Sequence, residues 1–157
     1  PEFQRELGEA LCDIGEEMGT FRRDCLVADL AACLDRHAEV RRSRKSALDR
    51  PALKACGRLL REACAEDLRM EELEDLAGMD RFTLARQFRA VFGTSPHRYL
   101  VMRRLEKVKA QLADGETLAD AAHANGFADQ SHMTRHFKRA FGMTPGHWRQ
   151  LCAASRI

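Results

Sequence analysis

The chain has 157 residues, a length that predicts one domain or one domain with an appendage. Charged residues make up 32% and aromatic residues 6%, with 4 Pro and 10 Gly, a composition that favours helices over a β-sandwich or barrel. No apolar run is long enough for a membrane span, and the first residues do not follow the pattern of a secretory signal. We therefore expect an all-α protein located in the cytoplasm.

The charge is unevenly distributed although the formal net charge is only +2. Residues 62–80 hold eight acids and one base, whereas residues 81–157 hold thirteen Lys and Arg against five acids. A basic half of this density is typical of a protein that binds a polyanion.

Residues 5–40 predict one or two amphipathic helices, with a break near Gly19. Apolar residues recur there at alternating spacings of three and four, as in the seam of a coiled coil. Such a seam either pairs two chains into a homodimer or packs back on its own chain. The dimerisation candidates are Leu7, Leu11, Ile14, Met18 and Phe21.

Residues 41–50 are predicted to be a basic linker, with a solvated helix end or a phosphate-contacting arm as alternatives. From residue 51 to residue 152, capping and breaking residues delimit a compact series of helices. The boundaries predict helices that begin at Pro51, cover about 70–77 before Gly78, run from Asp80 to Gly93, from Pro96 to about Leu112, from Thr117 to Asn125, from about Asp129 to Gly142, and begin again at Pro145.

The sequence between Arg86 and Pro96 is repeated between Arg135 and Pro145, at an offset of 49 residues. Both copies share the pattern Arg-x-Phe-x-x-x-Phe-Gly-x-(Ser/Thr)-Pro, and Tyr99 and Trp148 keep the same offset. Two helix-turn-helix subdomains joined by a long linker helix account for this repeat.

A helix-turn-helix unit binds DNA because its first helix supports a second, whose outward side chains reach base edges in the major groove. Arg can bind guanine with two hydrogen bonds, Gln can bind adenine, and an apolar side chain can contact the thymine methyl group. Phe82 either makes that methyl contact or packs in the protein. The base-reading candidates are Phe82, Ala85, Arg86, Gln130, Ser131, Thr134 and Arg135.

Other basic residues of this half are candidates for contacts with phosphates, which supply affinity without sequence information. Each could instead pair with an acid or lie along its own helix. These candidates are Arg81, Arg89, Arg98, Arg103, Arg104, Lys138 and Arg139.

An alternative function is a thiol- or metal-responsive sensor. Cys25 and Cys33 lie eight residues apart, and His132 and His136 have the i, i+4 spacing of two metal ligands. No third ligand has a suitable spacing, however, and six cysteines without a C-x-x-C pair fit reduced thiols packed in helices. We expect no metal and no cofactor, and because no nucleotide-binding or nucleophile motif is present, we expect no enzymatic activity.

The segment from Ala121 through Gly126 to Pro145 resembles the signature of the AraC/XylS family of bacterial transcription regulators, and the resemblance covers about residues 51–151. It implies a domain of seven helices whose two recognition helices enter successive major grooves. Arg69 departs from the pattern because it replaces a capping Ser or Thr, so its helix start is expected to fray. Asp80 replaces a common Ser but still caps, and Ala85 removes one polar contact.

The resemblance further implies that the chain activates transcription, often through contact with RNA polymerase. Residues 1–40 would be the helical tail of a missing N-terminal effector domain, with an unknown effector ligand. The overall expectation is a sequence-specific regulator that binds double-stranded DNA.

Overall fold

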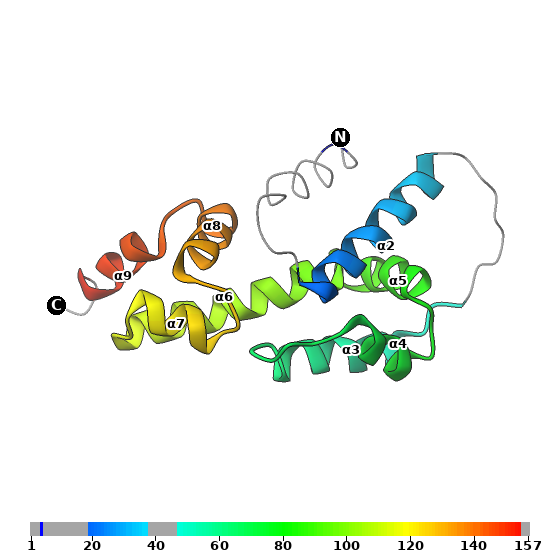
Figure 1. Cartoon of the computed structure of the whole chain (residues 1–157), viewed down its shortest axis with the longest axis horizontal. Helices are drawn as coiled ribbons and strands as arrows, with labels where there is room; N and C mark the ends of the chain where they lie inside the picture. The colour runs from blue at the N-terminus through cyan, green and yellow to red at the C-terminus, as the bar shows by residue number, and fades with distance from the viewer. Residues whose placement is uncertain (1–3, 5–18, 38–46, 155–157) are drawn as a thin grey trace. The chain divides into compact units, whose positions relative to one another are not determined.

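The computed structural model describes residue 4 and residues 19–37 and 47–154, and all regular structure in those ranges is helical. This confirms the all-α prediction. The helices are α2 (Thr20–His37), α3 (Arg50–Glu62), α4 (Met70–Ala77), α5 (Arg81–Phe92), α6 (Pro96–Asp114), α7 (Leu118–Ala124), α8 (Gln130–Phe141) and α9 (Pro145–Ala154) (Figure 1).

The helices fall into two compact units. Unit 1 comprises Pro1–Leu59 and Leu68–Arg98, and unit 2 comprises Leu60–Asp67 and Tyr99–Ile157. Each unit contains one helix pair with the expected turn: α4 packs on α5 in unit 1, and α7 packs on α8 in unit 2. Helices α3 and α6 each begin in unit 1 and end in unit 2.

Helix boundaries follow the predicted capping residues closely. Gly78, Gly93 and Gly142 end their helices with φ values of 61°, 71° and 73°, a conformation that glycine adopts without steric cost. The Asp80 carboxylate accepts hydrogen bonds from the amides of Phe82 and Thr83 at 3.0 and 3.1 Å. These two bonds satisfy backbone amides that have no partner within the first turn of α5.

The start of α4 differs from the prediction that Arg69 would leave it frayed. The Arg69 side chain makes no capping hydrogen bond, but the Glu72 carboxylate accepts one from the Arg69 amide at 2.8 Å. This is the reciprocal half of a capping box, and it stabilises the helix start without a Ser or Thr.

The core of unit 2 forms between α6, α7 and α8. Leu105, Val108 and Leu112 of α6 are buried against Met133 and Phe137 of α8. The equivalent core of unit 1 includes Leu84 and Phe88 of α5. In both units the inner face of the second helix carries apolar residues, so its outer face is left for polar ones.

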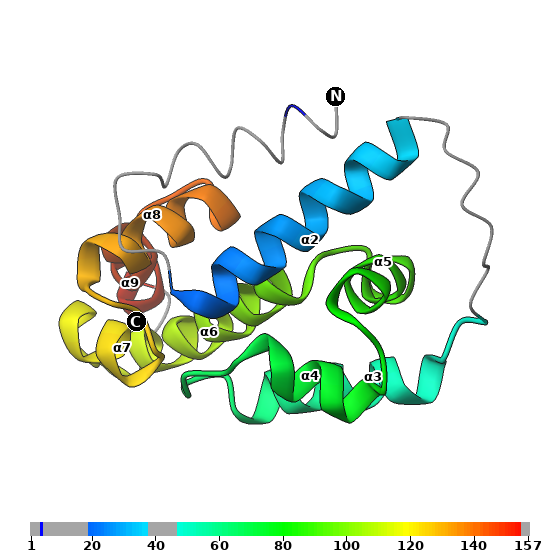
Figure 2. The same cartoon turned by 45° about the vertical axis from the view of Figure 1, so that its right-hand side comes forward.

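Helix α2 packs on α5 and, less extensively, on α4 (Figures 1 and 2). Phe21 is buried, with its ring centroid 6.3 Å from that of His97. Phe21 thus packs on its own chain in this structure, which is the second of the two alternatives for the seam, and pairing of two chains through it stays a prediction. The other seam residues, Leu7, Leu11, Ile14 and Met18, lie outside the described residues.

Candidate nucleic-acid interface

The outer face of α5 carries two exposed candidates for base contact. Leu84 and Phe88 are buried completely, whereas the Phe82 side chain is 45% exposed and Arg86 is exposed. Asp80 caps the helix directly before Phe82, which holds the first turn in place. Phe82 and Arg86 lie four residues apart and therefore share one face of the helix.

Ala85 does not belong to this exposed face. It is only 1% exposed, so it is not accessible to a base in this conformation, and a base contact at Ala85 stays a prediction. The neighbouring positions on its stripe of the helix, Arg81 and Arg89, explain the burial because both form ion pairs with α2.

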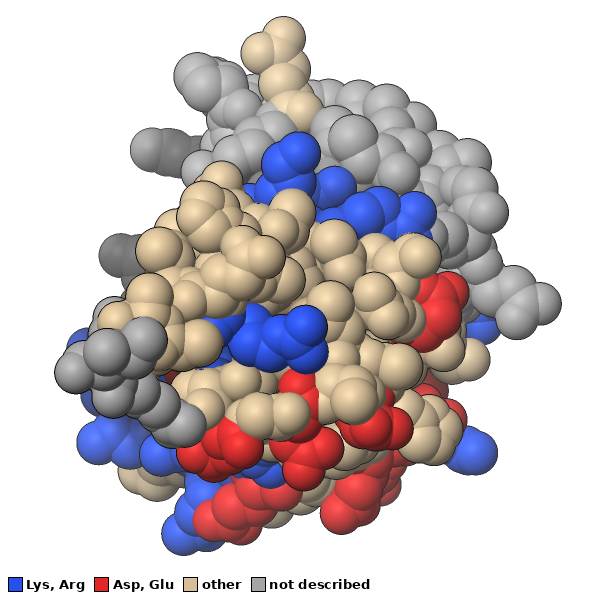
Figure 3. All heavy atoms as spheres, turned by 90° about the vertical axis from the view of Figure 1, so that its left-hand side faces the viewer, with Lys and Arg blue, Asp and Glu red and all other residues tan. Residues whose placement is uncertain are grey.

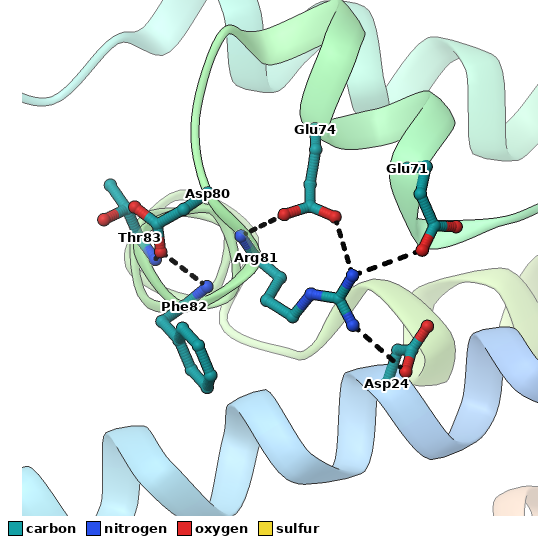
Figure 4. Close-up of polar contacts among 7 residues, drawn as sticks. All are labelled: Asp24, Glu71, Glu74, Asp80, Arg81, Phe82 and Thr83. Carbon is teal, nitrogen blue, oxygen red and sulfur yellow. Dashed lines mark hydrogen bonds and ion pairs between the residues drawn. The ribbon is translucent and has the colours of Figure 1, made fainter.

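Arg81 is held by carboxylates from two helices (Figure 4). One guanidinium nitrogen lies 3.1 Å from Asp24 of α2, and the other lies 3.2 Å from both Glu71 and Glu74 of α4. The Glu74 carboxylate also accepts a hydrogen bond from the Arg81 amide at 2.7 Å. The structure therefore contradicts the prediction of an available phosphate contact at Arg81, since protein carboxylates occupy its donors.

Arg89 is in a similar position on the same flank of α5. Its Nη2 atom lies 3.1 Å from Asp29 of α2, and both side chains are mostly buried. In this conformation Arg89 is also not available to a phosphate. The two arginines nearest the predicted reading face of unit 1 are thus bound by α2.

The second recognition helix, α8, presents a more open face. Met133 and Phe137 are fully buried, whereas Gln130, Ser131 and Arg135 are exposed and Thr134 is half-buried. The Asp129 carboxylate caps the helix by accepting a hydrogen bond from the His132 amide at 2.7 Å. The structure therefore brings all four predicted base-reading residues of unit 2 to the first turns of one helix.

The remaining phosphate candidates differ in exposure. Arg98, Lys138 and Arg139 are exposed. Arg103 lies 2.8 Å from Glu106 and stacks over the Tyr99 ring at 5.0 Å from its centroid. Arg103 is thus partly committed to its own helix.

Arg104, a predicted phosphate contact, makes structural hydrogen bonds within its own unit. Its guanidinium donates hydrogen bonds to the carbonyl oxygens of Cys64 and Gly126 at 2.6 Å and of Glu66 at 3.1 Å. Burial lowers the pKa of this guanidinium. Arg104 fastens the turn after α3 and the turn after α7 to α6.

The sensor alternative gains no support from the described residues. The Nε2 atoms of His132 and His136 lie 2.9 Å apart, within hydrogen-bond distance of each other. No group of three or more His, Cys, Asp or Glu side chains that could hold a metal occurs in the described ranges. Burial raises the pKa of the Cys56 thiol to about 11, which opposes formation of a reactive thiolate.

The surface drawn in Figure 3 is not uniformly basic. Lys and Arg side chains on that face are separated by uncharged atoms, and acidic side chains gather along its lower part. On the face drawn, the basic residues are therefore scattered and do not form a continuous positive surface.

Sequence reasoning missed the roles of Asp24 and Asp29. Both read as ordinary polar positions of an amphipathic helix, and only the packing of α2 on α5 reveals their partners. A helix start was predicted at about Asp129, and this residue is the N-cap of α8, as is typical of an Asp that precedes an amphipathic segment.

Two capped helix pairs, each with a polar outer face on its second helix, define a bipartite helix-turn-helix protein. A helix-turn-helix domain family matches residues 73–151. An AraC-like transcription regulator of Streptomyces lividans is 41% identical over 80 residues, which are 50% of this chain and 26% of that protein. The transcriptional activator RhaS of Citrobacter koseri is 31% identical over 93% of this chain and 53% of its own length.

The DNA-binding domain of the global transcriptional factor AdpA, solved with a target DNA, is a structural neighbour. It has a TM-score of 0.62 and 26% identity, and the match covers 67% of this chain and 96% of that one. The chain belongs to the AraC/XylS family of helix-turn-helix transcription regulators. It spans between about a quarter and about half of the length of the curated relatives described above.

Proposed function

We propose that this chain binds double-stranded DNA at specific sequences, with α5 and α8 each inserted in a major groove. The observation that carries the proposal is α8, a capped helix that exposes Gln130, Ser131 and Arg135 above a fully buried apolar face. That arrangement fits the geometry in which the first turns of a recognition helix reach base edges.

Base recognition is assigned by side-chain chemistry. Arg135 suits guanine and Gln130 suits adenine, while Ser131 and Thr134 discriminate less. In unit 1, Arg86 suits guanine and the exposed ring of Phe82 suits a thymine methyl group. Each good bidentate contact contributes about 1–3 kcal/mol of discrimination.

Phosphate contacts supply the remaining affinity. Arg98, Lys138 and Arg139 are exposed on or beside the two helix pairs and are the phosphate contacts we propose. In the proposed complex the two units occupy successive major grooves, about 34 Å apart along the duplex. The protein would then recognise an asymmetric site with two short blocks.

The wider role follows the family. We propose that the chain acts in the cytoplasm by binding and not by catalysis, activates transcription, and contacts RNA polymerase. The name of the relative RhaS, a transcriptional activator, supports activation. None of the helices in the described ranges is long and apolar enough to span a membrane. We also propose that two chains pair through residues 5–40, of which residues 5–18 and 38–40 lie outside the described residues.

Selection from a random duplex library at about 50 and 200 mM salt tests the proposal, because phosphate contacts weaken steeply over that range. Enrichment of two short blocks about one helical turn apart is expected. Duplexes that bind without any enriched sequence would contradict sequence-specific recognition.

Arg135→Ala, with Arg139→Ala as the matched control, tests the assignment of roles within α8. Loss of the bidentate contact at Arg135 is expected to cost about 1–3 kcal/mol and to relax selectivity at one base pair. Arg139→Ala should weaken all sequences alike. Binding titrations with single-base variants of the selected site measure both effects, and a uniform loss in Arg135→Ala would make that residue a phosphate contact.

A further inference from the structure

Helix α2 covers one whole flank of the first recognition helix. Arg81, Ala85 and Arg89 occupy successive turns of α5 and form a single stripe. The two arginines at the ends of this stripe pair with Asp24 and Asp29 of α2. Residues 81 and 89 are about 12 Å apart along the helix, so α2 contacts α5 along about two turns.

The residues of α2 that face α5 are as buried as the residues of a protein core. Ala28, which lies between the two aspartates, is 0% exposed, and Cys25 is 1% exposed. On the opposite side of α2, Val27 is 51% exposed. The contact is therefore specific to one face of α2.

Helix α2 lies beside the exposed residues of α5 and does not cover them. Phe82 and Arg86 are exposed while α2 is packed on the same helix. What α2 withholds from DNA is the flank of α5 formed by Arg81, Ala85 and Arg89.

The α2 carboxylates also take the place that phosphates would take. Asp24 and Asp29 bind the guanidinium groups of Arg81 and Arg89 at 3.1 Å, with geometry that a phosphate oxygen could adopt. Binding to DNA would exchange these ion pairs for contacts with the duplex backbone.

We infer that α2 is an intrachain lid on one flank of the first helix-turn-helix unit, which must leave α5 before Arg81 and Arg89 can contact the backbone of a duplex. The inference rests on the proposed function, since it concerns the same recognition helix. It adds a closed state, in which α2 holds the two arginines, and an open state, in which they can bind phosphates.

Alkylation of cysteines in the full chain tests the lid directly. Cys25 belongs to α2 and is buried, and burial together with the nearby aspartates raises the pKa of its thiol, so it should react slowly with iodoacetamide while α2 stays packed. Cys56 is buried in the same unit, so its reaction reports unfolding of that unit. Peptide mass spectrometry resolves the two sites.

Addition of the duplex selected from the library is expected to accelerate alkylation of Cys25 and to leave Cys56 protected. Binding of the duplex is followed in parallel by fluorescence anisotropy. A duplex that binds while Cys25 stays as protected as in the free protein would overturn the inference, because α2 would then remain in place in the complex.

Ala28→Gln places a larger side chain in the buried contact and is designed to displace α2 without a change in charge or in α5. Val27→Gln, at an exposed position of α2, is the matched control. Ala28→Gln should expose Cys25 and tighten duplex binding, by about tenfold if the open form is about a tenth of the wild-type population. Val27→Gln should do neither.

The two proposals fail in different ways. If Ala28→Gln exposes Cys25 but binds the selected duplex no more tightly than wild type, the lid is overturned while sequence-specific binding stands. If neither protein enriches any sequence from the library, sequence-specific binding is overturned, and the lid falls with it. Equal tightening by both glutamine variants would also count against the lid.

Discussion

Among the described residues, arginine side chains differ in exposure and in the groups that they contact. Arg81, Arg89 and Arg104 are bound by carboxylates or carbonyl oxygens of their own unit. Arg86 and Arg135 are exposed on the outer faces of the two recognition helices. Sequence reasoning treated all of them as candidates for DNA contact because residue type and helical phase do not reveal a partner from a distant segment.

The structural role of Arg104 gives a first prediction. Arg104→Met should lower the free energy of unfolding by about 3 kcal/mol, because it leaves carbonyl oxygens of Cys64 and Gly126 without their charged donor. Urea unfolding followed by the fluorescence of Trp148, which lies in unit 2, measures the loss.

Arg139→Met is the matched control for this prediction. Arg139 is exposed, so the free energy of unfolding of the variant should change by no more than about 0.5 kcal/mol. The affinity of the variant for DNA should instead depend less on salt, with a slope of log K against log salt that is smaller by about 0.9. A reversed pattern, with Arg104→Met stable and altered in its salt slope, would restore Arg104 as a phosphate contact.

Asp80 gives a prediction about pH. Hydrogen bonds from the Thr83 side chain and from the amides of Thr83 and Phe82 lower the pKa of this carboxyl in the folded state. Its contribution to stability is therefore complete above the unfolded pKa of about 3.9 and is lost as the pH falls through the folded pKa.

Asp80→Ala should cost about 1 kcal/mol near neutral pH, and this cost should shrink under acidic conditions. Asp80→Asn keeps a capping acceptor but does not titrate, so its stability should lack this part of the pH dependence. Urea unfolding between pH 3 and 6, followed by circular dichroism, measures both. An Asp80→Ala cost that stays constant down to pH 3 would show that the carboxylate is not the stabilising form.

At the scale of elements, the two recognition helices have the same length and the same ending. Helices α5 and α8 have 12 residues each and end at Gly93 and Gly142 with nearly equal φ values. Each also pairs two phenylalanine rings one turn apart, at 4.4 Å in unit 1 and 4.7 Å in unit 2. The repeat in the sequence was a reliable guide because these features arise from residues close together in the chain.

The packing between elements was predictable to a smaller extent. Helix boundaries depend on local capping residues, and the structure confirms those at Gly78, Asp80 and Pro145 to the residue. The helix on which α2 packs, in contrast, depends on which distant segment offers a complementary face. Because local sequence does not determine this packing, Phe21 had two interpretations and the burial of Ala85 was not predicted.

Two glycines of unit 2 provide a comparison of turns. Gly126 and Gly142 have φ values of 70° and 73°, but a Cβ on Gly126 would lie 2.9 Å from the Ala65 carbonyl oxygen, whereas one on Gly142 would meet no atom within 4 Å. Gly142→Ala should therefore cost about 1–2 kcal/mol, the conformational penalty alone.

Gly126→Ala should cost more than Gly142→Ala by about 1–3 kcal/mol, because the close approach to backbone adds to the same conformational penalty. Urea unfolding of both variants measures the difference. Equal costs would show that the turn after α7 relaxes away from residue 65 without penalty.

At the scale of the whole molecule, salt dependence separates the closed from the open form. Release of α2 removes Asp29 from Arg89 and Asp24 from one guanidinium nitrogen of Arg81, whose other nitrogen stays paired with Glu71 and Glu74 of α4. If both then contact phosphates, the logarithmic salt slope of duplex binding by Ala28→Gln should be steeper than that of Val27→Gln by about 1.8. Anisotropy titrations between 50 and 200 mM salt measure the slopes, and equal slopes would show that these arginines do not reach the duplex backbone.

The path of the chain between the two units constrains how the protein can be divided. Leu60–Asp67 belongs to unit 2 although unit 1 precedes and follows it in sequence, and Arg104 fastens this segment in place. A fragment that begins at α6 would thus lack a piece of its own interior. No single cut in the chain separates the two units, so a fusion or domain exchange that keeps either unit complete has to carry both.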